Sequence, residues 1–453
     1  MPLSNRRETL ILLCGDLVCF FLALVFSLYI RGLEKPDLPS LAYHLYPFSI
    51  LFTLALLVFF IAGLYEKPTL FFQSGLPSLL LNAQLINAVI ALVFFYFIPI
   101  FGINPKTILF LYLVTAFVLI FLWRLYGRKI FQSKKRHRAL LLARGEEMKE
   151  LILEVNNNPR YPFLFSRVID IDTENAASFE SIIRTEIEKN DVSLVVSDMR
   201  NVILSPELSE LQIQTAKKIY WVDFSDVYEL VFDRVSLENF NPGIFIEQSR
   251  SNAHVFYDLL KRVMDLFLGS ILSLVGLVLY PFVYIFVKLD DGGEVFIPQV
   301  RIGESEEPLA VYKFRTMRTN NARSEKWIPE EKNMITRVGH ILRKMSLDEV
   351  PQVFNVFRGT MSLIGPRADI EGLGKRLKAE IPNYTLRTLI KPGISGWAQI
   401  QQIYKKGNIS PQSIEETRLR LSYDLFYIKY RSVFLDIKIA LRTITILLSR
   451  IFS

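Results

Sequence analysis

An acidic pair, Asp348 and Glu349, is the feature of this 453-residue chain best suited to chemistry. It follows a basic pair, Arg343 and Lys344, and precedes an apolar run. Ser346, three residues before Glu349, fits a capping box that would place Asp348 in the first turn of a helix. Carboxylates and phosphate groups are both favoured at a helix start.

Pro351 leaves two positions for this helix start. A proline disfavours helical backbone angles at the residue before it, Val350. The helix therefore begins either at Ser346 or later, with Asp348 in the preceding turn. Taken alone, the spacing is more typical of an ordinary solvated helix start than of a catalytic site.

The segment that leads into the acidic pair is strongly basic. From Lys313 to Lys344 there are nine Lys or Arg and three Glu, which leaves a net charge of +6. Such a run is commonly a solvated face, but here small apolar elements interrupt it and the acidic pair follows directly. Because arginine forms paired hydrogen bonds with phosphate, the arrangement favours an anionic substrate. Nucleic acid is the competing interpretation, but no helix-turn-helix, zinc-finger or RNP pattern supports it.

Two later segments, 391–399 and 433–452, each fit more than one role. The first is a loop punctuated by glycine, which permits a close approach of backbone to a ligand. Trp397 in this loop fits stacking on a base, a place at a membrane interface, or plain packing. The second segment puts basic residues among apolar ones, as an interfacial amphipathic helix does and as a core helix also does.

The composition indicates membrane segments and argues against cysteine chemistry. Hydrophobic residues make up 51% of the chain and the mean hydropathy is +0.28, which is high for a wholly soluble protein. The formal net charge of +8 suits nucleic acid, an anionic membrane surface or an anionic substrate. Only Cys14 and Cys19 occur, both in one apolar segment, so disulfides, a cysteine zinc site and a cysteine nucleophile are not expected. The four histidines lack metal-ligand spacing.

Four apolar segments predict transmembrane helices, at residues 9–30, 46–65, 79–101 and 107–123. Positive charge is concentrated before the first segment and after the fourth. The positive-inside rule therefore places the N-terminus and everything after residue 124 in the cytoplasm. Asp16, inside the first segment, is either functional or satisfied by a partner or by the membrane interface.

The region after these segments has the pattern of an α/β domain with a parallel, Rossmann-like sheet. Strands are expected at 139–143, 166–172, 193–197 and 218–222, with a helix at 146–156. The first strand–helix turn has one glycine, Gly145, followed by two acids, whereas dinucleotide binding needs G-x-G-x-x-G and room for a pyrophosphate. We therefore expect a structural or regulatory role for this domain.

Residues 266–287 carry no charge and are long enough to cross a bilayer. Lys261 and Arg262 precede this segment and Lys288 follows it, so neither end is marked as external. Pro281 should kink a helix at this point. A re-entrant helix hairpin that returns to the same membrane face fits both observations.

Several motifs follow one another in the C-terminal region: K-R-V-M-D, an apolar helix with proline, Q-V-R-I-G, K-F-R-T-M, L-R-K-M-S-L-D-E-V-P-Q-V-F-N-V, M-S-L-I-G-P-R and K-P-G-I-S-G-W-A-Q. In this order they resemble the motifs of the bacterial sugar transferases, which are monotopic phosphoglycosyl transferases, also called polyprenyl glycosylphosphotransferases. They cover about residues 255–453, and the layout before them resembles the long members of that family.

Three domains are therefore expected. The first is a four-helix transmembrane domain at 1–126. The second is a Rossmann-like α/β domain with a degenerate nucleotide loop at 127–250. The third is a mainly α-helical catalytic domain at 251–453, with a re-entrant membrane helix at about 263–288.

The resemblance implies transfer of a sugar 1-phosphate from a UDP-sugar to undecaprenyl phosphate, with release of UMP and a requirement for Mg²⁺. It implies that Asp348 is the nucleophile that carries the phosphosugar and that Glu349 assists in metal or proton handling; both are expected Mg²⁺ ligands. Phosphate partners are expected at Arg301, Lys313, Arg315, Arg343, Arg367 and Arg387. The reaction would start polysaccharide assembly, such as exopolysaccharide biosynthesis, at the cytoplasmic face of the bacterial inner membrane.

Two positions depart from the family pattern. Tyr280 stands where a serine usually precedes the kink proline, Pro281, and Ala368 stands where a proline usually follows Arg367. Neither change touches the acidic pair.

Other functions remain open from the sequence. The alternative to an enzyme is an inactive scaffold or nucleotide sensor, which would have no need of the acidic pair. A transporter would need more polar residues in its helices than Asp16. A homo-oligomer that uses the Rossmann-like domain as its interface is compatible with the sequence, and nucleic acid is not an expected partner.

Overall fold

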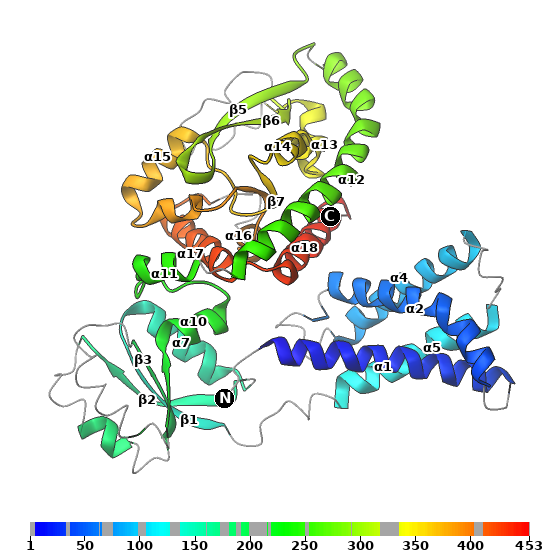
Figure 1. Ribbon diagram of the computed structural model, residues 1–453, viewed down its shortest axis with the longest axis horizontal. Coiled ribbons are helices and arrows are strands. Elements are labelled where there is room, and N and C mark those ends of the chain that lie inside the picture. The colour runs from blue at the N-terminus through cyan, green and yellow to red at the C-terminus, as the bar shows by residue number, and fades with distance from the viewer. Residues whose placement is uncertain are drawn as a thin grey trace. The chain divides into compact units, whose positions relative to one another are not determined.

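The computed structural model describes residues 5–32, 37–62, 64–65, 76–97, 106–126, 136–159, 161–172, 181–186, 192–198, 215, 219–249, 253–290, 292–317, 335–402 and 411–452. The chain divides into two compact units, Met1–Val222 and Asp223–Ser453. The first contains a helical bundle and an open sheet, and the second contains helices arranged around two small strand pairs (Figure 1).

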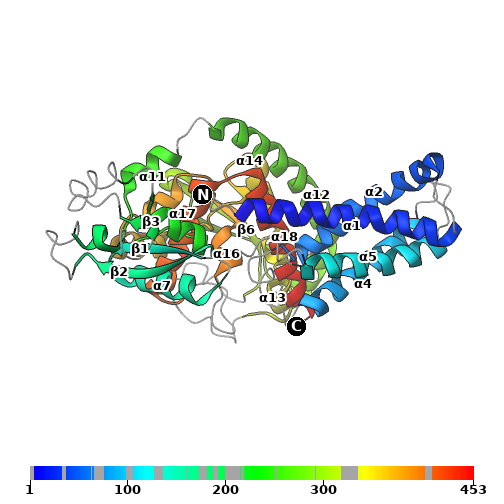
Figure 2. The same ribbon diagram turned by 90° about the horizontal axis from the view of Figure 1, so that it is seen from below.

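The bundle consists of four apolar helices, α1 (Asn5–Gly32), α2 (Leu38–Ile61), α4 (Leu76–Phe97) and α5 (Lys106–Tyr126). α1 and α5 lie side by side (Figures 1 and 2), and the core of the bundle is rich in aromatic rings such as Phe20, Phe48 and Phe59. Among the described residues, α1, α2, α5 and α12 of the second unit contain stretches long and apolar enough to cross a membrane. The apolar stretch of α4, Leu79–Phe95, is shorter. The four helices predicted in this region are confirmed.

Asp16 is buried between α1 and α5 and has its partners there. Arg124 donates hydrogen bonds to both of its carboxylate oxygens, and the Tyr65 hydroxyl donates to Oδ2 at 2.7 Å. Arg124 also donates to the Leu64 carbonyl at 2.9 Å. Of the roles open from the sequence, the structure favours a charge satisfied by a partner, since an unpaired carboxylate inside a bundle is very costly.

The sheet of the first unit has the strand order β2-β1-β3-β4. Its strands are β1 (His137–Ala143), β2 (Phe163–Asp170), β3 (Val192–Ser197) and β4 (Tyr220–Asp223). β1 pairs in parallel with both β2 and β3, so the predicted parallel sheet is confirmed. α7 (Gly145–Asn157) follows β1 and carries Glu146 and Glu147 in its first turn, where they disfavour a pyrophosphate. The Rossmann-like character of the domain stays a prediction.

The second unit begins with α10 (Phe224–Phe232), α11 (Pro242–Ser249) and the long helix α12 (Ala253–Asp290). An antiparallel hairpin follows, made of β5 (Phe296–Ile302), the turn η2 (Glu304–Glu306) and β6 (Pro308–Phe314). The remaining elements are α13 (Arg337–Lys344), η5 (Leu347–Gln352), α14 (Val353–Arg358), β7 (Ser362–Ile364), α15 (Glu371–Glu380), η6 (Tyr384–Thr388), β8 (Gly393–Ser395), α16 (Trp397–Gln401), α17 (Ile414–Tyr430) and α18 (Val433–Phe452). The predicted mainly helical C-terminal domain is confirmed.

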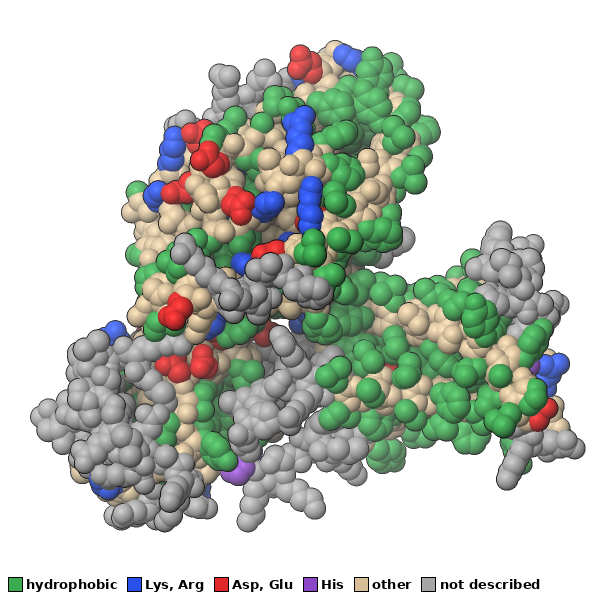
Figure 3. All heavy atoms as spheres, in the orientation of Figure 1, with side chains coloured by type: hydrophobic (Ala, Val, Ile, Leu, Met, Phe, Trp, Pro, Cys, Tyr) green, Lys and Arg blue, Asp and Glu red, His purple; other side chains and the backbone are tan. Residues whose placement is uncertain are grey.

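α12 is one continuous helix of 38 residues, with Pro281 inside it. Many of its apolar side chains between Leu259 and Leu289 are exposed, and Figure 3 shows hydrophobic side chains covering this edge of the unit. Tyr280 packs toward the protein, with its ring stacked 5.7 Å from that of Phe296 on β5. An uncovered apolar helix of this length is suited to contact with lipid. The re-entrant path of α12 stays a prediction.

Packing decides the role left open for Trp397 and shows that α18 has both buried and exposed apolar side chains. Trp397 is 1% exposed, donates from Nε1 to the Asp233 carbonyl at 2.9 Å and stacks on Phe426. It is therefore a core residue and neither a base-stacking platform nor an interface anchor. α18 buries Leu435 and Ile439 in the core while other apolar side chains on it stay exposed, so its place at a membrane interface stays a prediction.

Candidate active site

The acidic pair lies on a short 3₁₀ helix, η5, between α13 and α14. Ser346 enters this turn with left-handed backbone angles (φ +54°), and its side chain caps no helix. The predicted capping box is therefore wrong, because an N-cap residue needs extended backbone angles. The α-helix begins after Pro351, at Val353, so the later of the two predicted starts is correct. Asp348 accordingly lies in the turn before the helix.

α12 supports η5 by direct packing. A Cβ added at Gly276 would lie only 2.8 Å from Val350 Cγ1, so the glycine allows the two elements to approach closely. Val350 also belongs to a buried cluster with Phe314 of β6 and with Val283 and Val287 of α12. The residue that follows the acidic pair is thus held between the long apolar helix and the hairpin.

Two cations bind the Glu349 carboxylate. Lys313 Nζ, from β6, donates to Oε1 at 2.8 Å, and Arg367, which follows β7, donates to Oε2 at 3.1 Å and to Oε1 at 2.5 Å. Burial alone would raise the pKa of Glu349, but Arg367 and Lys313 outweigh burial and hold that pKa well below its usual range. Burial lowers the pKa of Lys313 to about 8, against the opposing charge of Glu349. Glu349 is therefore ionised, and it holds Lys313 and Arg367 beside the acidic pair.

Asp348 has a different environment. Among the described residues, no side chain donates a hydrogen bond to its carboxylate or forms an ion pair with it. Burial raises the pKa of Asp348, and the like charge of Glu349 adds to the rise, while Lys313 opposes it. A carboxylate that lies near cations and keeps its oxygens unbonded is suited to attack on phosphorus.

Arg301, on β5, extends the cationic group around the acidic pair. It donates to the Ala368 carbonyl at 2.7 Å and to the Gln299 side chain at 2.9 Å. Burial and the like charge of Arg367 lower the pKa of Arg301 to about 10, so it stays charged at neutral pH. Two arginines and a lysine from separate elements thus meet beside the acidic pair.

Arg343 and Arg315 have other hydrogen-bond partners. Arg343 donates from Nε to Thr316 Oγ1 at 3.0 Å, and its charge lowers the pKa of Asp348 against the effect of burial. Arg315 donates from Nε to the Met317 carbonyl at 3.0 Å. Contacts from Arg315 and Arg343 to a substrate phosphate stay predictions.

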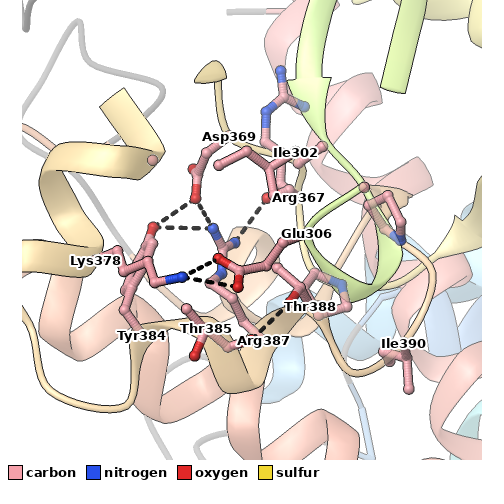
Figure 4. A pocket seen from close by; sticks show the side chains of 15 residues that line it. Ile302, Glu306, Arg367, Asp369, Lys378, Tyr384, Thr385, Arg387, Thr388 and Ile390 are labelled. Carbon is pink, nitrogen blue, oxygen red and sulfur yellow. Dashed lines mark hydrogen bonds and ion pairs between the residues drawn. The ribbon is translucent and has the colours of Figure 1, made fainter. Parts of the chain in front are cut away.

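Arg387 is buried behind the backbone of Arg367. Its guanidinium donates to Asp369 and Asp424 and, at 2.7 Å, to the Arg367 carbonyl; Figure 4 shows it between Asp369 and Arg367. Arg420 of α17 donates to the same carbonyl at 2.9 Å and to Asp369 at 2.8 Å. In this structure Arg387 holds the chain that presents Arg367 to Glu349. A direct phosphate contact by Arg387 stays a prediction.

No motif in the sequence predicted the other members of this buried cluster, Asp369, Tyr384, Arg420 and Asp424. One signal was present, because Arg420 and Asp424 are four residues apart and share a helix face. A buried network of this kind fixes the positions of its side chains, since removing one partner leaves a buried charge without a counter-charge. The cavity beside it in Figure 4, lined by residues such as Glu306 and Lys378, has a volume of only about 20 Å³ and holds no more than a water-sized group.

The described residues around the acidic pair supply too few ligands to hold Mg²⁺ by themselves, so the ion would bind together with a substrate and water. The described residues contain no group of three or more His, Cys, Asp or Glu side chains able to hold a metal. Within the described ranges, the Asp348 oxygens accept no hydrogen bond from a side chain, whereas both Glu349 oxygens accept from cations. Because Mg²⁺ is commonly held by one or two carboxylates together with substrate phosphates and water, the donor set fits an ion bound with a diphosphate.

The acidic pair thus lies among cations, on a turn that packs against a long apolar helix, an arrangement suited to an anionic ligand. The chain belongs to the bacterial sugar transferase family, whose model matches residues 256–450. It is 35% identical over 196 residues to a UDP-glucose:undecaprenyl-phosphate glucose-1-phosphate transferase of Caulobacter vibrioides, a match that covers 43% of this chain and 72% of the relative.

Two further relatives support the assignment to this family. An exopolysaccharide production protein of Rhizobium leguminosarum is 35% identical over 198 residues, or 42% of this chain and 96% of the relative. A UDP-N-acetylgalactosamine-undecaprenyl-phosphate N-acetylgalactosaminephosphotransferase of Aeromonas hydrophila is 32% identical over 257 residues, or 56% of this chain. The chain spans 59% of the length of the Aeromonas protein and 39% of the glucose-1-phosphate transferases of Escherichia coli and Klebsiella pneumoniae.

Proposed function

We propose that the protein transfers a sugar 1-phosphate from a UDP-sugar to undecaprenyl phosphate and releases UMP. The observation that carries this proposal is the contrast within the acidic pair. Glu349 is bound by Lys313 and Arg367, while Asp348 keeps its carboxylate unbonded among the described residues. The relatives from Aeromonas and Caulobacter are named for transfers of this class between a UDP-sugar and undecaprenyl phosphate.

The reaction proceeds in two steps. In the first, an Asp348 oxygen attacks the sugar-bound phosphorus of the UDP-sugar; an O–P bond forms, the bond to the bridging oxygen breaks, and UMP leaves with the electron pair. In the second, a phosphate oxygen of the lipid attacks the same phosphorus and the Asp348 carboxylate leaves. Lys313, Arg301 and Arg367 neutralise the negative charge on the phosphate oxygens. Asp348 and the substrate phosphates would hold Mg²⁺, which would supply further charge neutralisation. A contact from Glu349 to the ion stays a prediction, since both of its oxygens accept hydrogen bonds from cations.

The reaction takes place at the cytoplasmic face of the bacterial inner membrane and initiates the assembly of a polysaccharide or glycoconjugate. The distribution of basic residues, the exposed apolar side chains of α12 and the exopolysaccharide role named for the Rhizobium relative support this part of the proposal. A re-entrant α12 keeps the site on the same face as the N-terminus. Cysteines introduced at positions 255 and 292 should both resist labelling from outside intact cells, and labelling at 292 would contradict the re-entrant path.

The catalytic test uses purified protein with Mg²⁺, undecaprenyl phosphate and a panel of radiolabelled UDP-sugars. At least one sugar should give UMP and labelled lipid, and without the lipid the label should remain on the protein. Asp348→Asn should abolish both, because an amide is a poor nucleophile. Asp258→Asn, the same change at a carboxylate that is 59% exposed, is the matched control and should retain activity.

Two outcomes would contradict the proposal. A wild-type protein that releases no UMP from any sugar would favour a scaffold or nucleotide sensor. Full turnover in EDTA would contradict the role proposed for Mg²⁺, which predicts complete loss of activity on chelation and recovery on adding Mg²⁺ back.

A further inference from the structure

The C-terminal helix α18 brings another cation to the turn that carries the acidic pair. Arg450, in the last turn of α18, lies with Nη1 3.4 Å from Ser346 Oγ. Ser346 is the residue with left-handed backbone angles two positions before Asp348. Because strained backbone is concentrated at functional sites, a guanidinium placed against this residue points to a role at the site.

Exposed apolar side chains occur on the helices that precede and follow the acidic pair and on α18 itself. Ile341 of α13 is 62% exposed and Phe354 of α14 is 55% exposed, and these two helices flank the acidic pair on either side in the chain. α18 exposes Phe434, Ile437 and Ile444 and packs against α12, whose own apolar side chains are exposed. Arg450 therefore places a charged group beside Ser346, two residues before Asp348, on a helix that also exposes apolar side chains of the kind that contact lipid.

The second step of the proposed reaction needs a cation of its own. Lys313 and Arg367 bind Glu349, and Arg301 lies beside Arg367, so these three form the group that meets the diphosphate of the sugar donor. The acceptor is a phosphate monoester on a long apolar chain, and it reaches Asp348 from the membrane. A guanidinium at an apolar surface recognises such a group, because it pairs with two phosphate oxygens and is weakly hydrated.

We propose that Arg450 binds the phosphate of the acceptor lipid, so that α18 forms the acceptor half of the site. This inference rests on the proposed function. In the step concerned, a non-bridging oxygen of the lipid phosphate forms a bond to the phosphorus on Asp348, and the carboxylate departs with the electron pair of the broken O–P bond. No proton is required when the lipid phosphate reacts as a dianion.

The two steps can be measured separately, so the test distinguishes an effect on lipid binding from an effect on UMP release. In Arg450→Ala, UMP release and labelling of the protein without lipid should stay within about twofold of wild type, because the first step does not use Arg450. The KM for undecaprenyl phosphate should rise about tenfold or more, as expected for loss of a charge-assisted hydrogen bond. Arg450→Lys should give an intermediate value. Arg376→Ala, which removes an arginine that is 57% exposed on α15, is the matched control.

Two results would overturn the inference. An unchanged KM for the lipid in Arg450→Ala would remove the acceptor role. An equal loss in UMP release and lipid transfer would show that Arg450 only braces the Ser346 turn.

Direct binding separates failure of this inference from failure of the proposed function. Wild-type protein in nanodiscs should bind undecaprenyl phosphate in preference to undecaprenol, and Arg450→Ala should lose that preference, whether or not any UDP-sugar is turned over. Equal displacement by phosphatidylglycerol or by inorganic phosphate would instead show a general anion site and overturn the assignment to the acceptor.

Discussion

Asp348 and Glu349 are neighbours in the chain and yet meet opposite environments. Lys313 and Arg367 lower the pKa of Glu349 and occupy both of its oxygens. Burial and the nearby Glu349 charge raise the pKa of Asp348, whose oxygens stay unbonded among the described residues. Two carboxylates with divergent environments take divergent roles, here a nucleophile and a residue that organises cations.

The pH dependence of UMP release should show the titration of two groups, Asp348 on the acid side and Lys313 on the alkaline side. Because kcat/KM for the UDP-sugar reports the free enzyme, it should fall as pH drops through the pKa of Asp348, which lies above the ordinary value of 3.8. It should also fall as pH rises through about 8, where Lys313 loses the charge that balances the diphosphate. Lys313→Arg should keep the acid limb and move the alkaline limb upward, since arginine stays charged. An alkaline limb that does not move in this variant would rule out Lys313 as its source.

At the scale of elements, α12 serves both as an apolar helix for the membrane and as a support for the site. Two of its glycines, seven residues apart, face the elements that carry and follow the acidic pair. A Cβ at Gly276 would lie 2.8 Å from Val350, whereas a Cβ at Gly269 would lie 3.5 Å from Val353, an ordinary contact distance. The position of Asp348 therefore depends on the close fit at Gly276.

This difference predicts unequal effects of enlarging the two glycines. Gly276→Val should reduce UMP release at least tenfold, because a stiff β-branched side chain must displace Val350 and with it η5, at a cost of about 1–3 kcal/mol. Gly269→Ala, the control, should remain close to wild type. UMP release and thermal unfolding measured in the same nanodiscs check this. Equal activity of the two variants would contradict a supporting role for Gly276.

At the scale of the whole molecule, the residues of the proposed site all come from Asp223–Ser453, and the family match lies within the same unit. α10 belongs to this unit by its contacts, since Glu229 accepts hydrogen bonds from Lys429 at 2.7 Å and from Tyr430 at 2.6 Å. The Asp233 carbonyl, just after α10, accepts from the buried Trp397. The second unit therefore contains what the proposed chemistry needs.

A fragment of residues 223–453 should retain UMP release within about tenfold of the full chain, because transition-state contacts are preserved when every contacting group is kept. A fragment of residues 250–453 should be less stable, since it removes Glu229 and leaves Trp397 Nε1 buried without its acceptor. Each buried polar group left without a partner lowers the free energy of unfolding by about 1–3 kcal/mol. Thermal unfolding and UMP release of the two fragments check this. Equal unfolding temperatures would show that α10 does not stabilise the unit.

Local patterns in the sequence determined several parts of this protein. The lengths of apolar segments predicted the bundle and α12, and alternating strands and helices predicted the parallel sheet, because both depend on neighbouring residues. The acidic pair and the basic residues around it also stood out by type. The order of family motifs in the C-terminal region predicted the family.

The tertiary structure alone decided which of these residues meet. Glu349 is bound by Lys313 from 36 residues before it and by Arg367 from 18 residues after it, and Arg450 reaches Ser346 across 104 residues. Arg387, for which a phosphate contact stays a prediction, holds the Arg367 backbone together with Arg420 of α17. The predicted capping box failed because Ser346 adopts a left-handed backbone, which the residue type did not indicate. Such pairings depend on how distant elements pack, and burial then sets the charge state of each group.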